Sequence, residues 1–244
     1  MEKTVWENLL DSFERLHYTG ILWLISSLVA LIIGLKNYRK ERSFQLLIIY
    51  CLSSLLLMNV TFNFINYSLK FSKYKSFIYS EIINTFFVIV EISTFFYFFK
   101  QILNSKLVQH LIKVFSIILL MLCIAFLIKL TENGISKFQI RNISYSINII
   151  EFFSLIILCL IYFYRILTKD QIKPVKLNDS PSFWIVSGLF FYCIVSLPFL
   201  FIGNKMYVRS PYLFYLMGSI HYTSISLLFL CLAKAFSCKK TITI

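Results

Sequence analysis

Long apolar runs alternate with short polar connections along the whole chain. There are seven such runs, over residues 19–36, 44–65, 78–100, 108–130, 144–167, 182–203 and 212–235. Each is close to the roughly 20 residues that an α-helix needs to cross the hydrocarbon core of a bilayer. The pattern predicts an all-α, polytopic membrane helix bundle with seven transmembrane helices, which together form one domain over residues 19–238.

The start of the chain has a different pattern. Apolar residues such as Trp6 and Leu9 recur at helical spacing, and the acidic residues Glu7 and Asp11 mark the opposite face. A helix of this kind lies in the plane of the membrane interface, with its apolar face toward the acyl chains. We therefore expect residues 1–18 to form an interfacial amphipathic segment.

Composition supports a membrane protein: 59% of the residues are hydrophobic and only 14% are charged, whereas a soluble domain is about half apolar and a quarter charged. The net charge of +13 does not indicate nucleic acid, because the basic residues lie in short clusters between apolar runs, where they anchor helix ends. The lipid bilayer is the expected partner. The six cysteines have no CxxC spacing, so neither a zinc site nor a disulfide framework is predicted.

The first connection sets the predicted orientation. It holds four basic residues, Lys36, Arg39, Lys40 and Arg42, and basic loops stay on the cytoplasmic side of a membrane. We expect the N-terminus outside, the C-terminus inside and residues 239–244 as a short cytoplasmic tail. The expected location is the inner, cytoplasmic membrane of the cell.

Polar side chains recur at helical spacing in five of the runs. A charged group at the bilayer centre costs about 2.5–3.5 kcal/mol on insertion scales. We therefore expect Glu91 to have an interaction partner or a functional role. Asn84 lies seven residues before Glu91 and shares its helix face, which we expect to point into the bundle. At a rise of about 1.5 Å per residue, Glu91 and His221 fall near the mid-plane and Glu151 lies somewhat farther out.

These positions predict one polar pocket that opens outward and binds a ligand. The candidate ligand-binding residues are Asn59, Asn84, Glu91, Asn148, Glu151, Tyr192 and His221. A purely structural role stays open for each of them, because polar groups between membrane helices often only hydrogen-bond across the interface, at about 0.6 kcal/mol each. The first and fourth runs are nearly pure hydrocarbon and are expected to face lipid more than the other runs.

The sixth run carries four local signals. Ser180 followed by Pro181 predicts the start of its helix. Gly188 lets a neighbouring helix approach closely, and Tyr192 places a hydroxyl group near the mid-plane. Pro198 cannot donate a backbone hydrogen bond, which makes the outer half of this helix a candidate hinge.

Catalytic motifs are missing from the sequence. It has no GxSxG, HExxH or phosphate-binding glycine-rich loop. A retinal protein needs a lysine in the middle of its last helix, and Lys234 lies at the inner end of that run. Of the three histidines, only His221 is mid-membrane, too few for a zinc hydrolase. We expect no cofactor and no metal, and enzymatic activity stays open, with the motifs against it.

Three segments together resemble a known group. They are the stretch from Asn84 to Glu91, the helix around Glu151 and residues 179–185. The last opens an FW-x-x-x-G-x-x-x-Y pattern, formed here by Phe183, Trp184, Gly188 and Tyr192. These features resemble a group of uncharacterised seven-transmembrane-helix integral membrane proteins common in Bacteroidetes. The resemblance implies a seven-helix architecture and says little about function.

The leading functional hypothesis is a receptor-like sensory or signalling module. Its pocket binds a small molecule or a lipid, and its inner loops contact a membrane or cytoplasmic signalling protein. A small-solute or proton transporter is an alternative that could use Glu91 and Glu151, although the clear inverted repeats and broken helices of such folds are missing. A membrane-embedded lipid-modifying enzyme is the third alternative.

Overall fold

The computed structural model describes residues 18–37, 42–61, 73–131, 135–169 and 177–238, and all regular structure within them is helical. The prediction of an all-α chain is therefore confirmed for these residues. The elements are α2 (Tyr18–Asn37), α3 (Arg42–Ser53), η1 (Ser54–Thr61), α4 (Lys73–Ile102), α5 (Lys106–Leu130), α6 (Lys137–Lys169), η3 (Leu177–Asp179), α7 (Pro181–Arg209) and α8 (Pro211–Ser237). Of the predicted interfacial segment, residues 1–17 lie outside the described residues, as does the predicted tail, 239–244.

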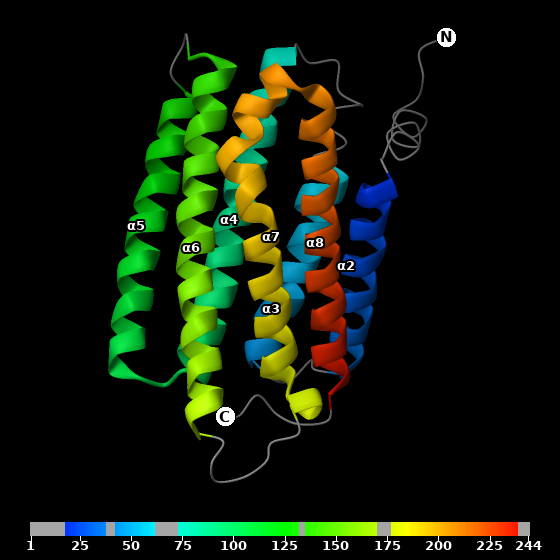
Figure 1. Cartoon of the computed structure of the whole chain (residues 1–244), viewed down its shortest axis with the longest axis vertical. Helices are drawn as coiled ribbons and strands as arrows, with labels where there is room; N and C mark the ends of the chain where they lie inside the picture. The colour runs from blue at the N-terminus through cyan, green and yellow to red at the C-terminus, as the bar shows by residue number, and fades with distance from the viewer. Residues whose placement is uncertain (1–17, 38–41, 62–72, 132–134, 170–176, 239–244) are drawn as a thin grey trace.

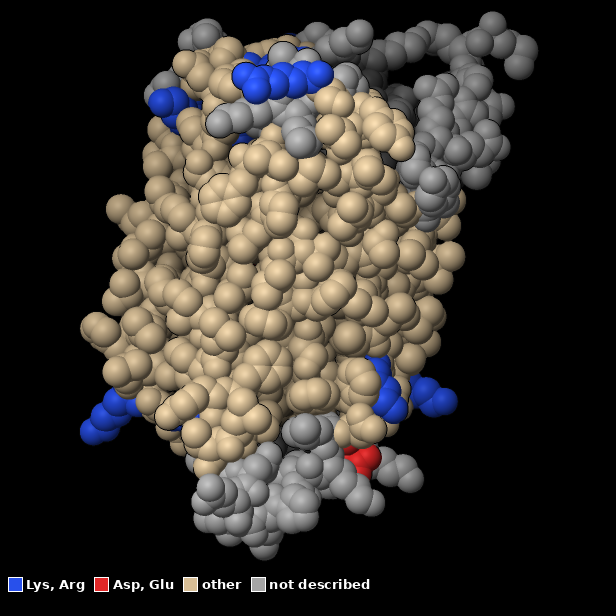
Figure 2. Space-filling model, in the orientation of Figure 1, with Lys and Arg blue, Asp and Glu red and all other residues tan. Residues whose placement is uncertain are grey.

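Six of the described helices are long and apolar enough to cross a membrane. They are α2, α4, α5, α6, α7 and α8, which match six of the seven apolar runs. On the face drawn in Figure 2, lysines and arginines gather at the two ends of the molecule, and a band without charged side chains separates them. Such a band fits the hydrocarbon core of a bilayer, where charged groups are costly. The chain is a multi-pass helical membrane protein.

The second apolar run is divided between two helices. The 12-residue α-helix α3 continues directly into η1, a π-helix of 8 residues. Its apolar part, Phe44–Met58, is shorter than the other spans. Figure 1 shows α3 standing among the long helices. The prediction of a seventh span therefore depends on α3 and η1 together.

The helices pack as a ring with one helix outside it. In the ring, α2, α3, α4, α6, α7 and α8 each contact the next, and α8 returns to α2. Helix α5 contacts α4 and α6 and lies at one edge of the bundle in Figure 1. Only 22% of its apolar window is buried, against 39% or more in the other spans. The prediction that the fourth run faces lipid is confirmed.

The same prediction is wrong for the first run, because 44% of the α2 window is buried, the same share as in α6 and α7. Helix α2 packs against both α3 and α8. Its small residues form the contact: Ala30 and Ser27 are fully buried. A Cβ atom added at Gly34 would lie 2.9 Å from Ile48 and 3.0 Å from Phe236. Small side chains let membrane helices approach closely, so an almost purely apolar sequence still packs inside the bundle.

Helix α7 begins and packs as its sequence predicts. It begins at Pro181, as predicted, and contains Pro198. A Cβ atom added at Gly188 would lie 2.6 Å from the Cβ of Cys231 in α8. The predicted close approach of a neighbouring helix at Gly188 is confirmed.

Candidate functional site

Two glutamates from different helices of the ring are buried in the bundle. Glu91 of α4 is 2% exposed and Glu151 of α6 is 1% exposed. Their carboxyl groups lie close enough to interact electrostatically. The hydroxyl group of Tyr50, in α3, donates a hydrogen bond to Oε1 of Glu91 at 3.2 Å. The prediction that Glu91 faces the bundle is confirmed.

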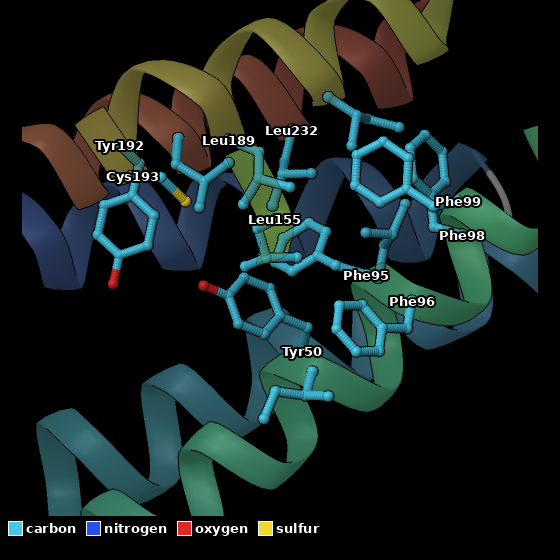
Figure 3. Close-up of a cluster of buried hydrophobic side chains, with 14 of the residues drawn as sticks. Tyr50, Phe95, Phe96, Phe98, Phe99, Leu155, Leu189, Tyr192, Cys193 and Leu232 are labelled. Carbon is cyan, nitrogen blue, oxygen red and sulfur yellow. The ribbon is translucent and has the colours of Figure 1, made fainter. Parts of the chain in front are cut away.

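Tyr192 of α7 joins these residues. Its side chain is buried, and its hydroxyl interacts electrostatically with both glutamates and with Tyr50. In Figure 3 the hydroxyl groups of Tyr50 and Tyr192 lie on the same side of the hydrophobic cluster, away from the labelled phenylalanines. We call Tyr50, Glu91, Glu151 and Tyr192 the carboxyl cluster. It draws one side chain from each of four helices.

The carboxyl cluster contains an acceptor that the described structure does not satisfy. Oε1 of Glu151 is buried and has no hydrogen-bond partner there. No lysine or arginine among the described residues interacts with Glu91 or Glu151. An unsatisfied buried polar atom costs about 1–3 kcal/mol, so this oxygen destabilises the protein unless it gains a partner.

His221 of α8 lies beside the cluster. Its ring centroid is 5.8 Å from that of Tyr192, and its ring stacks on Phe199 at a centroid distance of 5.5 Å. Nδ1 of His221 is 2.8 Å from Oγ of Ser196, which in turn is 3.1 Å from Oγ of Ser224. The Ser224 hydroxyl also donates to the backbone oxygen of His221 at 2.7 Å. This chain of hydrogen bonds joins α7 to α8.

Ser196 beside His221 has the spacing of a nucleophile and its base, but the surroundings do not fit acyl transfer. Such chemistry needs hydrogen-bond donors aimed at the developing oxyanion. Ser196 is fully buried inside α7, where backbone N–H groups bond within the helix, and nearby Pro198 has no N–H at all. Within the described residues there is also no group of three or more side chains that could hold a metal ion.

The three predicted asparagines are placed differently: Asn84 lies apart from the carboxyl cluster, Asn148 lies one turn from it, and the side chain of Asn59 is not described. Asn84 donates to Oγ of Ser144 in α6 at 3.4 Å, about 10 Å along α4 from Glu91. Asn148 is half-buried, one helical turn before Glu151. Asn59 belongs to η1, but its side chain is not among those described.

The interior differs between the two ends of the bundle. We call the end at which α2, α4 and α6 begin the predicted outer end, and the opposite end the predicted inner end (Figure 1). Asn84 and Ser144 lie on the outer side of the cluster, where Ser144 also donates to Glu81. On the inner side large apolar side chains fill the core, namely Phe95, Phe98, Phe99 and Leu103. The buried polar residues there include the small Thr94, Ser154 and Ser182. Figure 3 shows these phenylalanines on the far side of Tyr50 from Tyr192.

Reasoning from the sequence missed Tyr50, and it noted Ser196 as a polar residue of the sixth run without including it among the candidate binding residues. Tyrosines of membrane proteins gather near span ends, whereas Tyr50 lies well inside the run 44–65. That depth was the available signal. Ser196 carried no signal beyond its helical spacing from Tyr192.

Comparison of this chain with protein-family models, with curated proteins and with solved structures finds no match. The chain's own chemistry is the basis for inferring function. Two carboxyl groups and two phenol hydroxyls gather within the ring, with an imidazole next to them. Such a set can recognise a small molecule by charge and hydrogen bonding.

Proposed function

We propose that this protein is a receptor-like sensory or signalling module of a bacterial inner membrane. It has seven spans, an outer N-terminus and an inner C-terminus, and a small molecule or lipid binds at the carboxyl cluster from the outer side. The observation that carries this proposal is the convergence of Glu91 and Glu151, from α4 and α6, in one buried region. Ionisable residues kept inside a membrane are costly, and they typically mark binding sites or ion pathways.

The large apolar side chains on the predicted inner side of the cluster favour a binding module over a transporter. A transporter must open the same central site to both sides in turn. In this protein the polar side chains of Asn84 and Ser144 are hydrogen-bonded to each other between the cluster and the predicted outer end. Toward the predicted inner end, the buried side chains of Phe98 and Phe99 close the core. A proton or solute transporter is the second candidate, because it would use the same two glutamates.

Helix α7 connects the site to the predicted inner face. Tyr192 lies in the cluster, and Pro198 makes the outer half of α7 a hinge. At the inner end of α7, the indole N–H of Trp184 donates to the backbone oxygen of Asn178 at 3.0 Å. The ammonium group of Lys234, in α8, lies 5.9 Å from the Trp184 ring centroid. Movement of α7 on ligand binding would reach this contact, where a membrane or cytoplasmic signalling protein could detect it.

Cysteine labelling tests from which side the cluster is reached. Asn148→Cys, one turn outward from Glu151, is treated with a membrane-impermeant thiol reagent in spheroplasts and in inside-out vesicles. We expect labelling from the outer side only. Leu158→Cys is the matched control, because Leu158 is fully buried on the same helix toward the predicted inner end, and it should stay unlabelled. The unsubstituted protein measures the background from its own cysteines.

Two results would contradict the proposal. Labelling of Leu158→Cys from the inner side would show that water reaches the core from that side, which fits a transporter. Labelling of Asn148→Cys only in inside-out vesicles would reverse the orientation and place the site on the cytoplasmic side.

A further inference from the structure

Two basic side chains of α6 are engaged away from the carboxyl cluster. Arg141 of α6 interacts with Glu81, and Arg165 donates from Nη1 to the backbone oxygen of Leu103 at 2.6 Å. Within the described residues, the cluster therefore holds two acids and no counter-charge. Two carboxylates that share a buried site cannot both ionise without a positive partner.

The unsatisfied oxygen of Glu151 further limits the chemical class of the missing partner. Oε1 of Glu151 is buried without a hydrogen bond in the described structure, and the hydroxyl of Tyr50 is already used by Glu91. A carboxylate oxygen only accepts hydrogen bonds or coordinates cations. A partner that is both positively charged and able to contact a carboxylate oxygen would satisfy the charge and the oxygen together.

We propose that the ligand of the carboxyl cluster is a small monovalent cation that binds between Glu91 and Glu151 and contacts Oε1 of Glu151. This inference depends on the proposed function, because it names the ligand class of the same site. Two sources share the chemistry: a protonated amine with N–H donors, and an alkali-metal ion. Both carry one positive charge and both bind carboxylate oxygens.

Aromatic packing excludes recognition through the faces of the Tyr50 ring. Phe87 and Phe229 both stack on that ring, at centroid distances of 5.6 Å and 5.5 Å. A quaternary ammonium ion has no N–H donor and depends on open ring faces for cation–π contact. The site should therefore prefer methylammonium or sodium over tetramethylammonium.

Thermal unfolding of the purified full chain in nanodiscs tests the proposal. Methylammonium and sodium are titrated separately at constant pH, with tetramethylammonium chloride replacing them to hold the ionic strength. At 100 times Kd, one bound cation should raise the unfolding temperature by about 5–10 °C. Glu151→Gln should abolish the rise. Glu81→Gln should keep it, because Glu81 lies with Ser144 and Arg141, outside the cluster.

The results separate the possible ligands. A rise with methylammonium alone assigns an amine, and a rise with sodium alone assigns an alkali-metal ion. No rise with either cation, or an equal rise in Glu151→Gln, overturns the proposal. Acetamide serves as a neutral probe: a rise that depends on Glu151 with acetamide but not with the cations refutes the cation and leaves the binding function intact. Failure of the binding function itself is seen separately, in the labelling of Asn148→Cys.

Discussion

Gly188 is where the packing of α7 on α8 can be tested most sharply. In Gly188→Ala, the new Cβ would lie 2.6 Å from the Cβ of Cys231, about 0.8 Å inside the 3.4 Å at which ordinary contact begins. Because the obstructing atom is fixed to the backbone of α8, the helices must separate. Overpacking of this kind costs about 1–3 kcal/mol, and the better helix propensity of alanine recovers roughly 0.5–1 kcal/mol.

We therefore expect Gly188→Ala to lower the free energy of unfolding by up to about 2.5 kcal/mol, and Gly188→Leu to lower it further. The assay is unfolding by SDS in mixed micelles. Gly218→Ala in α8 is the matched control, because its Cβ would have no atom within 4 Å; it should be neutral or gain up to about 1 kcal/mol. Adding Cys231→Gly should recover part of the loss in Gly188→Ala. Equal effects of Gly188→Ala and Gly218→Ala would refute the close contact.

Three further predictions concern the site and the topology. Glu91→Gln keeps an acceptor for the Tyr50 hydroxyl and should cost less than about 1 kcal/mol, whereas Glu91→Leu leaves that donor unpaired and should cost about 1–3 kcal/mol; equal unfolding midpoints would argue against the bond. Tyr192→Phe keeps the ring contacts with Phe152 and His221, so it should unfold within about 0.5 kcal/mol of the parent but respond less to methylammonium; a large loss of stability would assign the hydroxyl to structure. A reporter active only in the periplasm, fused after Ile244, should be inactive, and activity would reverse the topology.

Hydropathy predicted six of the spans, because long apolar runs in a membrane protein have one stable form, the helix. Local residues refined them: Pro181 marks the start of α7, and Gly188 marks a close helix contact. The division of the second run into α3 and η1 was not predictable, because α-helices and π-helices in an apolar run contain the same types of residue. The packing of α2 was missed because Ala30 and Ser27 read as ordinary residues of an apolar run.

Depth along a helix was the useful signal for the site. It predicted that Glu91, Glu151, Tyr192 and His221 lie near one level, and the structure brings these four together. It could not indicate which helices are neighbours, because ring order depends on packing between residues far apart in sequence. For that reason the hydrogen bond between Tyr50 and Glu91 could not be predicted from the sequence.

The central claim is that Glu91 and Glu151 form one site, and a double-mutant cycle measures this directly. The free energy of unfolding is determined by SDS titration for the parent, Glu91→Gln, Glu151→Gln and the double variant. Residues in contact show coupling energies of about 0.5–3 kcal/mol, and we expect a value in that range. The pair Glu81→Gln and Glu151→Gln is the control and should be additive within about 0.5 kcal/mol. Additivity of the Glu91 and Glu151 variants would contradict the account.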